Sequence, residues 1–164
     1  MVTNVNEHIM RAFAINDREL VLEFFNQMGG ETRAFFNRGD GNKNNALSYF
    51  DKNGEEPDAV RFLSSVTDEN GKEIMTGYVF AWDMKTSVPI LGIAVREEYK
   101  GLGLGRLLMK YLTDYLKDNN YGGVMLTTSM ANIRGQSLYT RMGFEHVGTH
   151  TSGEMLYILR FEKL

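Results

Sequence analysis

Cysteine is absent from the 164 residues of this chain. That absence excludes a disulfide framework, a thiolate metal site and a cysteine nucleophile, and it fits the reducing cytoplasm, where we expect the protein to reside. Only three histidines occur, at His8, His146 and His150, so we expect no metal cofactor. No apolar run approaches the length of a membrane span, and charges interrupt the first 24 residues. We therefore expect neither a secretion signal nor a membrane partner.

An excess of basic residues is also lacking, since the formal net charge is -3 and the isoelectric point is about 5.6. This balance disfavours a general nucleic-acid partner. The 43% hydrophobic content is sufficient for one continuous core without metal or disulfide support. We expect a single domain over residues 1–164, and a homodimer is compatible with the sequence.

The chain alternates between helical and strand patterns in an order that predicts a mixed α/β fold. Asn16 or Asp17 is expected to cap the first helix, and Asn70-Gly71 is a strong hairpin signal between two strands. Residues 37–45 are expected to form a loop, within a segment up to residue 57 that we assign to an active-site wall. The expected strands are 8–15, 59–67, 73–82, 88–95, 124–128, 144–149 and 155–161. Further helical segments are expected at 32–36, at 46–51, after Gly105 and at 133–142.

The most informative stretch is the loop Lys100-Gly101-Leu102-Gly103-Leu104-Gly105-Arg106, between a strand and an amphipathic helix. Glycines let backbone N–H groups approach an anion closely, and a helix N-terminus adds partial positive charge. The loop therefore suits a pyrophosphate, although a plain tight turn would have the same glycines. A P-loop would need Gly-Lys-Ser/Thr, and a dinucleotide fingerprint would place its third glycine one position later.

A second motif follows at the right distance. It comprises Asn132, the pair Leu138-Tyr139 and the pair Gly143-Phe144, in and after a predicted helix. Together, the two motifs resemble those of the GNAT superfamily of N-acetyltransferases, with Lys100 in the place of the usual Arg or Gln. The resemblance extends from about Ile74 to the C-terminus.

The resemblance implies a mostly antiparallel seven-stranded mixed sheet with a central splay, flanked by about four helices. It also implies acetyl-coenzyme A as co-substrate, with its pantetheine arm beside the strand 88–95. The residues then expected to bind the coenzyme are Ile93, Ala94, Val95, Lys100, Gly101, Leu102, Gly103, Leu104, Gly105, Arg106 and Asn132. For Asn132, helix capping is the simpler interpretation, and both roles are compatible.

Tyr139 is the residue we expect to act in catalysis, by donating a hydrogen bond or a proton to the departing thiolate. The simpler alternative is a buried aromatic ring with a satisfied hydroxyl. The general base stays open. Some relatives carry a glutamate five residues ahead of the asparagine, where this chain has Thr127, which cannot serve as a base. The remaining candidates are Asp83, Glu97, Glu98, Glu145, His146, His150, Glu154 and a water chain.

The predicted function is direct transfer of an acetyl group from acetyl-coenzyme A to a primary amine of a small molecule or a protein. The alternative is a non-catalytic sensor of acyl-coenzyme A, which the presence of Tyr139 disfavours. A toxin that acetylates charged tRNA is a third class, and it would require a basic face that the acidic composition does not favour.

Overall fold

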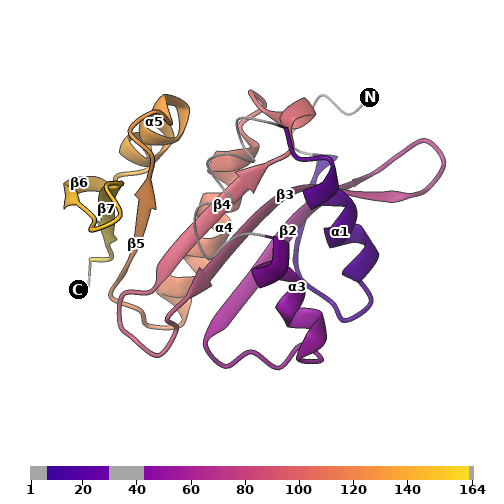
Figure 1. Cartoon of the computed structure of the whole chain (residues 1–164), viewed down its shortest axis with the longest axis horizontal. Coiled ribbons are helices and arrows are strands. Elements are labelled where there is room, and N and C mark those ends of the chain that lie inside the picture. Colours follow the sequence, from indigo (N-terminus) through magenta and orange to yellow (C-terminus); the bar gives the residue numbers. More distant parts are fainter. Residues whose placement is uncertain (1–6, 30–42, 163–164) are drawn as a thin grey trace.

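The computed structural model describes residues 7–29 and 43–162. A seven-stranded sheet in the order β1-β2-β3-β4-β5-β7-β6 forms its centre (Figure 1). The strands are β1 (Ile9–Ala12), β2 (Ala59–Thr67), β3 (Glu73–Trp82), β4 (Ile90–Val95), β5 (Gly123–Thr128), β6 (Glu145–Thr149) and β7 (Met155–Arg160). Every neighbouring pair is antiparallel except β4 and β5. The expected mixed, mostly antiparallel sheet is confirmed.

Four α-helices flank the sheet within the described ranges: α1 (Arg18–Asn26), α3 (Lys43–Asp51), α4 (Leu104–Asp118) and α5 (Ile133–Arg141). One apolar core joins α1 and α3 to one face of β2–β4, and includes Phe24, Phe50, Tyr78 and Phe80. A second core joins α4 and α5 to the opposite face through residues such as Leu108 and Tyr139. Figure 1 shows these two layers on either side of β2–β4. Within the described ranges, no helix is long and apolar enough to cross a membrane.

The sheet opens between β4 and β5, which separate along their length in Figure 1. Their only registered pair is Ile90 with Met125, at the start of β4, with a hydrogen bond from Met125 N to Pro89 O of 2.9 Å. From there the two strands diverge. This is the central splay that the sequence resemblance implied.

Several expected boundaries need correction. The first strand is shorter than 8–15, and β4 begins at Ile90 because Pro89, which has no N–H, precedes it. Part of the expected loop, from Lys43, is helical as the start of α3. The expected helix at 32–36 lies outside the described residues.

Asp17 occupies the N-cap position of α1, but its side chain does not cap the helix. Instead the carboxylate accepts from Arg11, at 2.6 and 2.9 Å, and from the backbone N of Ala14 at 2.7 Å. These bonds with Arg11 hold the pKa of Asp17 below its ordinary value even though burial opposes the effect. The acidic side chain therefore ties β1 to the start of α1.

Candidate active site

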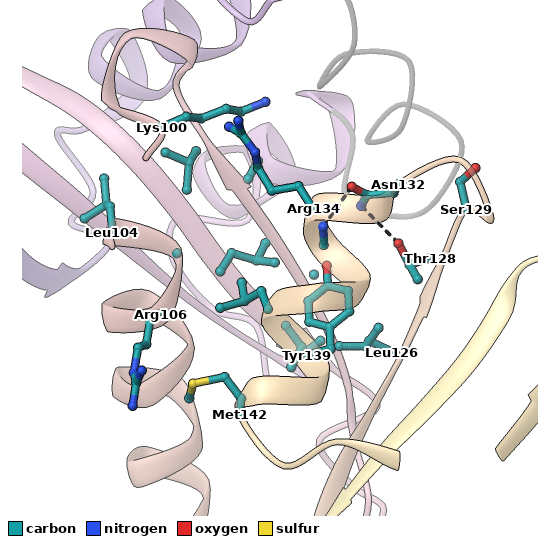
Figure 2. Close-up of a pocket in the computed structure, with 18 of the residues that line it drawn as sticks. Lys100, Leu104, Arg106, Leu126, Thr128, Ser129, Asn132, Arg134, Tyr139 and Met142 are labelled. Carbon is teal, nitrogen blue, oxygen red and sulfur yellow. Dashed lines mark hydrogen bonds between the residues drawn. The ribbon is translucent and has the colours of Figure 1, made fainter. Parts of the chain in front are cut away.

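A cavity of about 820 Å³ opens at the splay (Figure 2). Its walls come from β4, the glycine loop, the first turn of α4, the end of β5 and one side of α5. The expected site residues that line it are Ile93, Ala94, Val95, Lys100, Gly101, Gly103, Leu104, Gly105, Arg106, Asn132 and Tyr139. Leu102 is the one expected residue that is not in this lining. The structure thus brings together residues from motifs about 30 positions apart in the chain.

The edge of β4 presents backbone groups to the cavity. Arg96 N donates to Thr76 O at 2.8 Å, so these two residues form a hydrogen-bonded pair of the β3–β4 ladder. Such pairs alternate in an antiparallel ladder. The N–H and C=O groups of Ile93 and Val95 therefore point away from β3 and toward the splay. Because buried backbone groups need partners, this edge suits an amide-containing ligand.

The glycine loop leaves open space where side chains would otherwise lie. Gly101 and Gly103 have φ values of +83° and +85°, a left-handed conformation that glycine adopts at little cost. A Cβ built on either residue meets no atom within 4 Å. Gly103 also occupies the N-cap position of α4, whose first N–H groups face the same space. The loop has both the room and the polarity for an anion.

In the part of the chain that the structure describes, four cationic side chains belong to the lining of the cavity. Lys100 forms an ion pair with Glu97 at 3.0 Å, and Arg106 follows on α4. Two further arginines of the lining, Arg134 and Arg141, come from α5. Figure 2 shows the Lys100 and Arg134 side chains directed toward each other across the mouth of the cavity. Like charges in this arrangement favour an anion between them.

Asn132 is the N-cap of α5, as the simpler interpretation predicted. Its Oδ1 accepts from Gly135 N at 3.1 Å, and its Nδ2 donates to Thr128 Oγ1 at 3.0 Å (Figure 2). A Cβ on Gly135 would lie 2.4 Å from the Asn132 amide nitrogen, so only glycine leaves this side chain in place. Asn132 thereby joins the end of β5 to the start of α5 at the cavity wall.

Tyr139 lies deeper in the cavity and is 7% exposed. In Figure 2 its hydroxyl points toward the end where Asn132 and Thr128 meet. Burial raises the pKa of Tyr139 to about 12, and hydrogen bonding with Thr128 partly opposes that rise. The phenol is therefore held in its neutral form, with a proton to donate.

Aromatic rings line the cavity on the face covered by α1 and α3. Phe80 and Trp82 stack with ring centroids 5.3 Å apart, and both line the cavity. A Cβ on Gly92 would lie 2.4 Å from the Phe80 ring, so glycine at this position makes room for the aromatic side chain. Tyr78, by contrast, is fully buried and hydrogen-bonded to Arg61 at 2.7 Å.

Among the candidate bases, the lining contains only Glu97 and Glu154. The other candidates, Asp83, Glu98, Glu145, His146 and His150, do not line the cavity. Glu98 pairs with Arg96 at 3.2 Å, His146 bonds to Gly148 O at 2.9 Å, and His150 bonds to Ser152 at 2.9 Å.

Sequence reasoning did not single out Arg134, Thr128 or Ser129. Arg134 follows Asn132 by two positions at the start of the helix, a spacing that could have suggested a cavity-facing cation. Thr128 reaches the site through its hydrogen bond with Asn132, and no sequence pattern predicts that bond.

The chain matches the model of the Acetyltransferase (GNAT) family over residues 22–144. It is 26% identical over 95 residues to streptothricin acetyltransferase of Streptomyces lavendulae, covering 58% of this chain and 49% of that protein. It is 29% identical over 84 residues to the [ribosomal protein bS18]-alanine N-acetyltransferase of Escherichia coli K12, covering 51% and 55% of the two chains. The chain thus spans about half the length of these curated relatives.

The fold matches that of PaiA N-acetyltransferase from Thermoplasma acidophilum, solved in complex with coenzyme A. The TM-score is 0.74 at 15% identity, over 94% of this chain and 99% of that one. The splayed sheet and the match over residues 22–144 define the class, and this chain belongs to the GNAT family of acetyltransferases.

Proposed function

We propose that this chain transfers the acetyl group of acetyl-coenzyme A directly to a primary amine. The observation that carries the proposal is the splay: the free backbone edge of β4, the glycine loop and Tyr139 all border one cavity. Direct transfer fits the absence of cysteine from the sequence, since no thiol exists to carry the acetyl group.

The residues of the cavity fit the coenzyme by chemistry. The amides of Gly101 to Arg106, with Lys100, Arg106 and Arg134, would hold the pyrophosphate. The backbone of Ile93 and Val95 would pair with the amides of the pantetheine arm, and one of these N–H groups would polarise the thioester carbonyl. Asn132 keeps one N–H of its amide for the coenzyme after its bonds to Thr128 and Gly135.

Tyr139 would then donate a hydrogen bond to the departing sulfur. Burial raises the pKa of Tyr139 to about 12, above the ~8.5 at which a thiol titrates in water, so full proton transfer from the phenol to the sulfur is unfavourable. We therefore assign Tyr139 to hydrogen-bond stabilisation of the thiolate, with solvent supplying the final proton.

A panel of primary amines, assayed by released thiol, tests the proposal. The panel includes streptothricin and a peptide with an N-terminal alanine, because two relatives are named for such acceptors. We expect saturable release of coenzyme A with at least one amine. Calorimetry measures acetyl-coenzyme A binding in parallel. Binding without turnover across the panel at pH 6 to 9 would contradict the transferase and support the sensor.

A further inference from the structure

Two carboxylates line the cavity in the described part of the chain, and they differ in their partners and in their position around the cavity. Glu97 lies next to the glycine loop and already pairs with Lys100 at 3.0 Å. Glu154 comes just before β7, on the other side of the splay. Among the described residues, no cation forms an ion pair with Glu154 within 4.0 Å; its side chain instead accepts a hydrogen bond from Thr127 Oγ1 at 3.2 Å.

The strand register shows which face of the sheet this carboxylate occupies. In the β5–β7 ladder Thr127 is opposite Leu156, and Thr128 is opposite Met155. Side chains alternate between faces along a strand, so Glu154 lies on the face of Thr127 and opposite to that of Thr128. Thr128 faces α5 and Asn132. Glu154 therefore lies on the side away from α5.

That side of the cavity is also the aromatic one. Phe80 belongs to the core on the α1 and α3 face, and Trp82 stacks on it. The residues that we assigned to coenzyme binding lie elsewhere, at the glycine loop, on α5 and along the edge of β4. An acceptor approaching the splay from the aromatic side would meet Glu154 and Thr127 before it meets Tyr139.

We propose that Glu154 is the general base of the transfer, oriented by the Thr127 hydroxyl. This proposal rests on the transferase activity proposed above. Glu154 lies within electrostatic reach of the Tyr139 hydroxyl, because its charge contributes to the raised pKa of that group. The cavity thus has a carboxylate and a phenol near each other, one to accept a proton and the other to donate a hydrogen bond.

The proton balance assigns each group a step. An alkylammonium titrates near ~10.4, so at neutral pH the acceptor arrives charged, and the Glu154 carboxylate attracts it. The carboxylate accepts one proton of the bound ammonium, directly or through water, and passes it to solvent before the nitrogen attacks. As the new N–C bond forms and the C–S bond breaks, the nitrogen becomes acidic and gives its second proton to Glu154, directly or through water. The sulfur leaves with its electron pair, hydrogen-bonded by Tyr139, and takes a proton from solvent while Glu154 releases one.

Other ionisable groups line the same cavity, among them Arg106 on α4. Tyr139, Arg134 and Arg141 belong to α5, and Glu97 with Lys100 lies on the glycine-loop side of the same cavity. His150 belongs to the same hairpin, and its backbone N donates to Glu154 O at 2.7 Å. Their charges affect the absolute position of any pH profile. The test therefore compares two proteins that share all these groups and differ only at Glu154.

The test is Glu154→Gln, with Glu145→Gln as the matched control. Glu145 is exposed on β6 and does not line the cavity, so its substitution removes the same charge from the same hairpin without changing the cavity. With the best amine of the panel, we expect Glu154→Gln to lower kcat/KM at pH 7 by about 10²–10⁴-fold. Glu145→Gln is expected to match the parent. Coenzyme A affinity by calorimetry should stay within about twofold in both variants, which also shows that they fold.

The pH profile separates a base from a structural residue. Without Glu154, only amine that is already neutral in solution reacts, so the rate of the variant keeps rising toward the pKa of the amine. The deficit should therefore shrink by roughly tenfold or more between pH 7 and 9.5. Glu154→Asp, which keeps the carboxylate, should recover part of the rate. A deficit that is constant with pH, or a parental kcat in Glu154→Gln, would overturn the assignment.

Amine binding gives a readout that needs no turnover. The same amine is titrated by calorimetry into protein saturated with coenzyme A, and Glu154→Gln should weaken its binding by roughly tenfold or more. Unchanged binding together with an unchanged pH profile would leave the transferase standing and remove Glu154 from its mechanism. A parent protein that turns over no amine would instead contradict the proposed function, and the base assignment with it.

Discussion

At the scale of single residues, the environment of Tyr139 combines deep burial with a nearby negative charge. Burial and the charges of Tyr157 and Glu154 all disfavour the phenolate, and only the bond with Thr128 favours it. A hydroxyl kept neutral at all working pH values is a constant hydrogen-bond donor. Such a group stabilises a thiolate without having to be regenerated at each turnover.

The substitution Tyr139→Phe tests this role. It removes one hydroxyl and keeps the ring, so packing against Phe144 and Tyr157 should persist. We expect kcat to fall by about 10²–10³-fold, the usual loss for one donor to a developing anion. Stability should fall by only about 0.5–1.5 kcal/mol, and coenzyme affinity should hardly change. A thermal melt, a binding titration and a rate on one preparation separate the effects. A lower melting temperature with near-parental kcat would show that Tyr139 is structural.

Single residues also mark the limit of what the sequence could predict about the site. Tyr139 and Asn132 lie in a recognisable motif, so their place at one cavity could be anticipated. Glu154 could be named only as one of several candidate bases. Its position depends on the pairing of β7 with β5, across about 27 residues of chain, and on one hydrogen bond from Thr127. Contacts between distant segments leave no local pattern to read.

At the scale of elements, the glycine loop is the feature that the sequence described best. The effect of a substitution on the backbone of this loop can be separated from its effect on ligand binding, because Gly71 provides a matched control for Gly103. Gly71, in the β2–β3 hairpin, has φ +80° and Gly103 has φ +85°, and a Cβ on either meets no atom within 4 Å. Both positions require a left-handed backbone conformation, and of the two only Gly103 lines the cavity.

We therefore predict that Gly103→Glu and Gly71→Glu lower stability by similar amounts, about 1–2 kcal/mol each. Only Gly103→Glu should weaken acetyl-coenzyme A binding, by roughly 10²-fold or more, because it places a negative charge where phosphates would lie. Calorimetry on both folded variants is the measurement. Equal affinities would contradict the assignment of the loop to the pyrophosphate.

Helices and strands that are marked by characteristic turn residues or by periodic apolar residues were predicted correctly, but the residues at which they begin and end were predicted less accurately. The Asn70-Gly71 turn is stabilised by Asp68, whose carboxylate accepts from two backbone N–H groups at 2.9 Å, so the hairpin is encoded locally. The predicted start of α3, at residue 46, was too late, since the helix begins at Lys43. Asparagine is a weak helix former, so residue type alone favoured a loop at positions 44 and 45. Asp17 was one of two expected caps, with Asn16, on residue type alone, whereas its carboxylate accepts hydrogen bonds from the guanidinium of Arg11.

At the scale of the whole molecule, the sheet has two parts that share little backbone pairing. β1–β4 form one antiparallel ladder and β5–β7 another, with Ile90 and Met125 as the registered pair between them. Side chains of α4 and α5 add contacts across the gap, including Leu138 close to Gly105. A ligand that pairs with the free edge of β4 and contacts α5 would join the two parts.

This arrangement predicts where coenzyme A should protect the backbone from hydrogen exchange. The N–H groups of Ile93 and Val95 point toward the splay, so their exchange should slow by roughly tenfold or more when the coenzyme pairs with them. Val79, inside the β3 ladder, is protected with or without the coenzyme, so any slowing there reports only the gain in global stability. At 100 times the dissociation constant, binding adds about 2.7 kcal/mol, which raises Tm by roughly 5–10 °C for a chain of this size. A rise in Tm without slower exchange at Ile93 and Val95 would place the coenzyme away from β4. Protection confined to the glycine loop would mean that the pyrophosphate binds there while the pantetheine arm lies outside the splay.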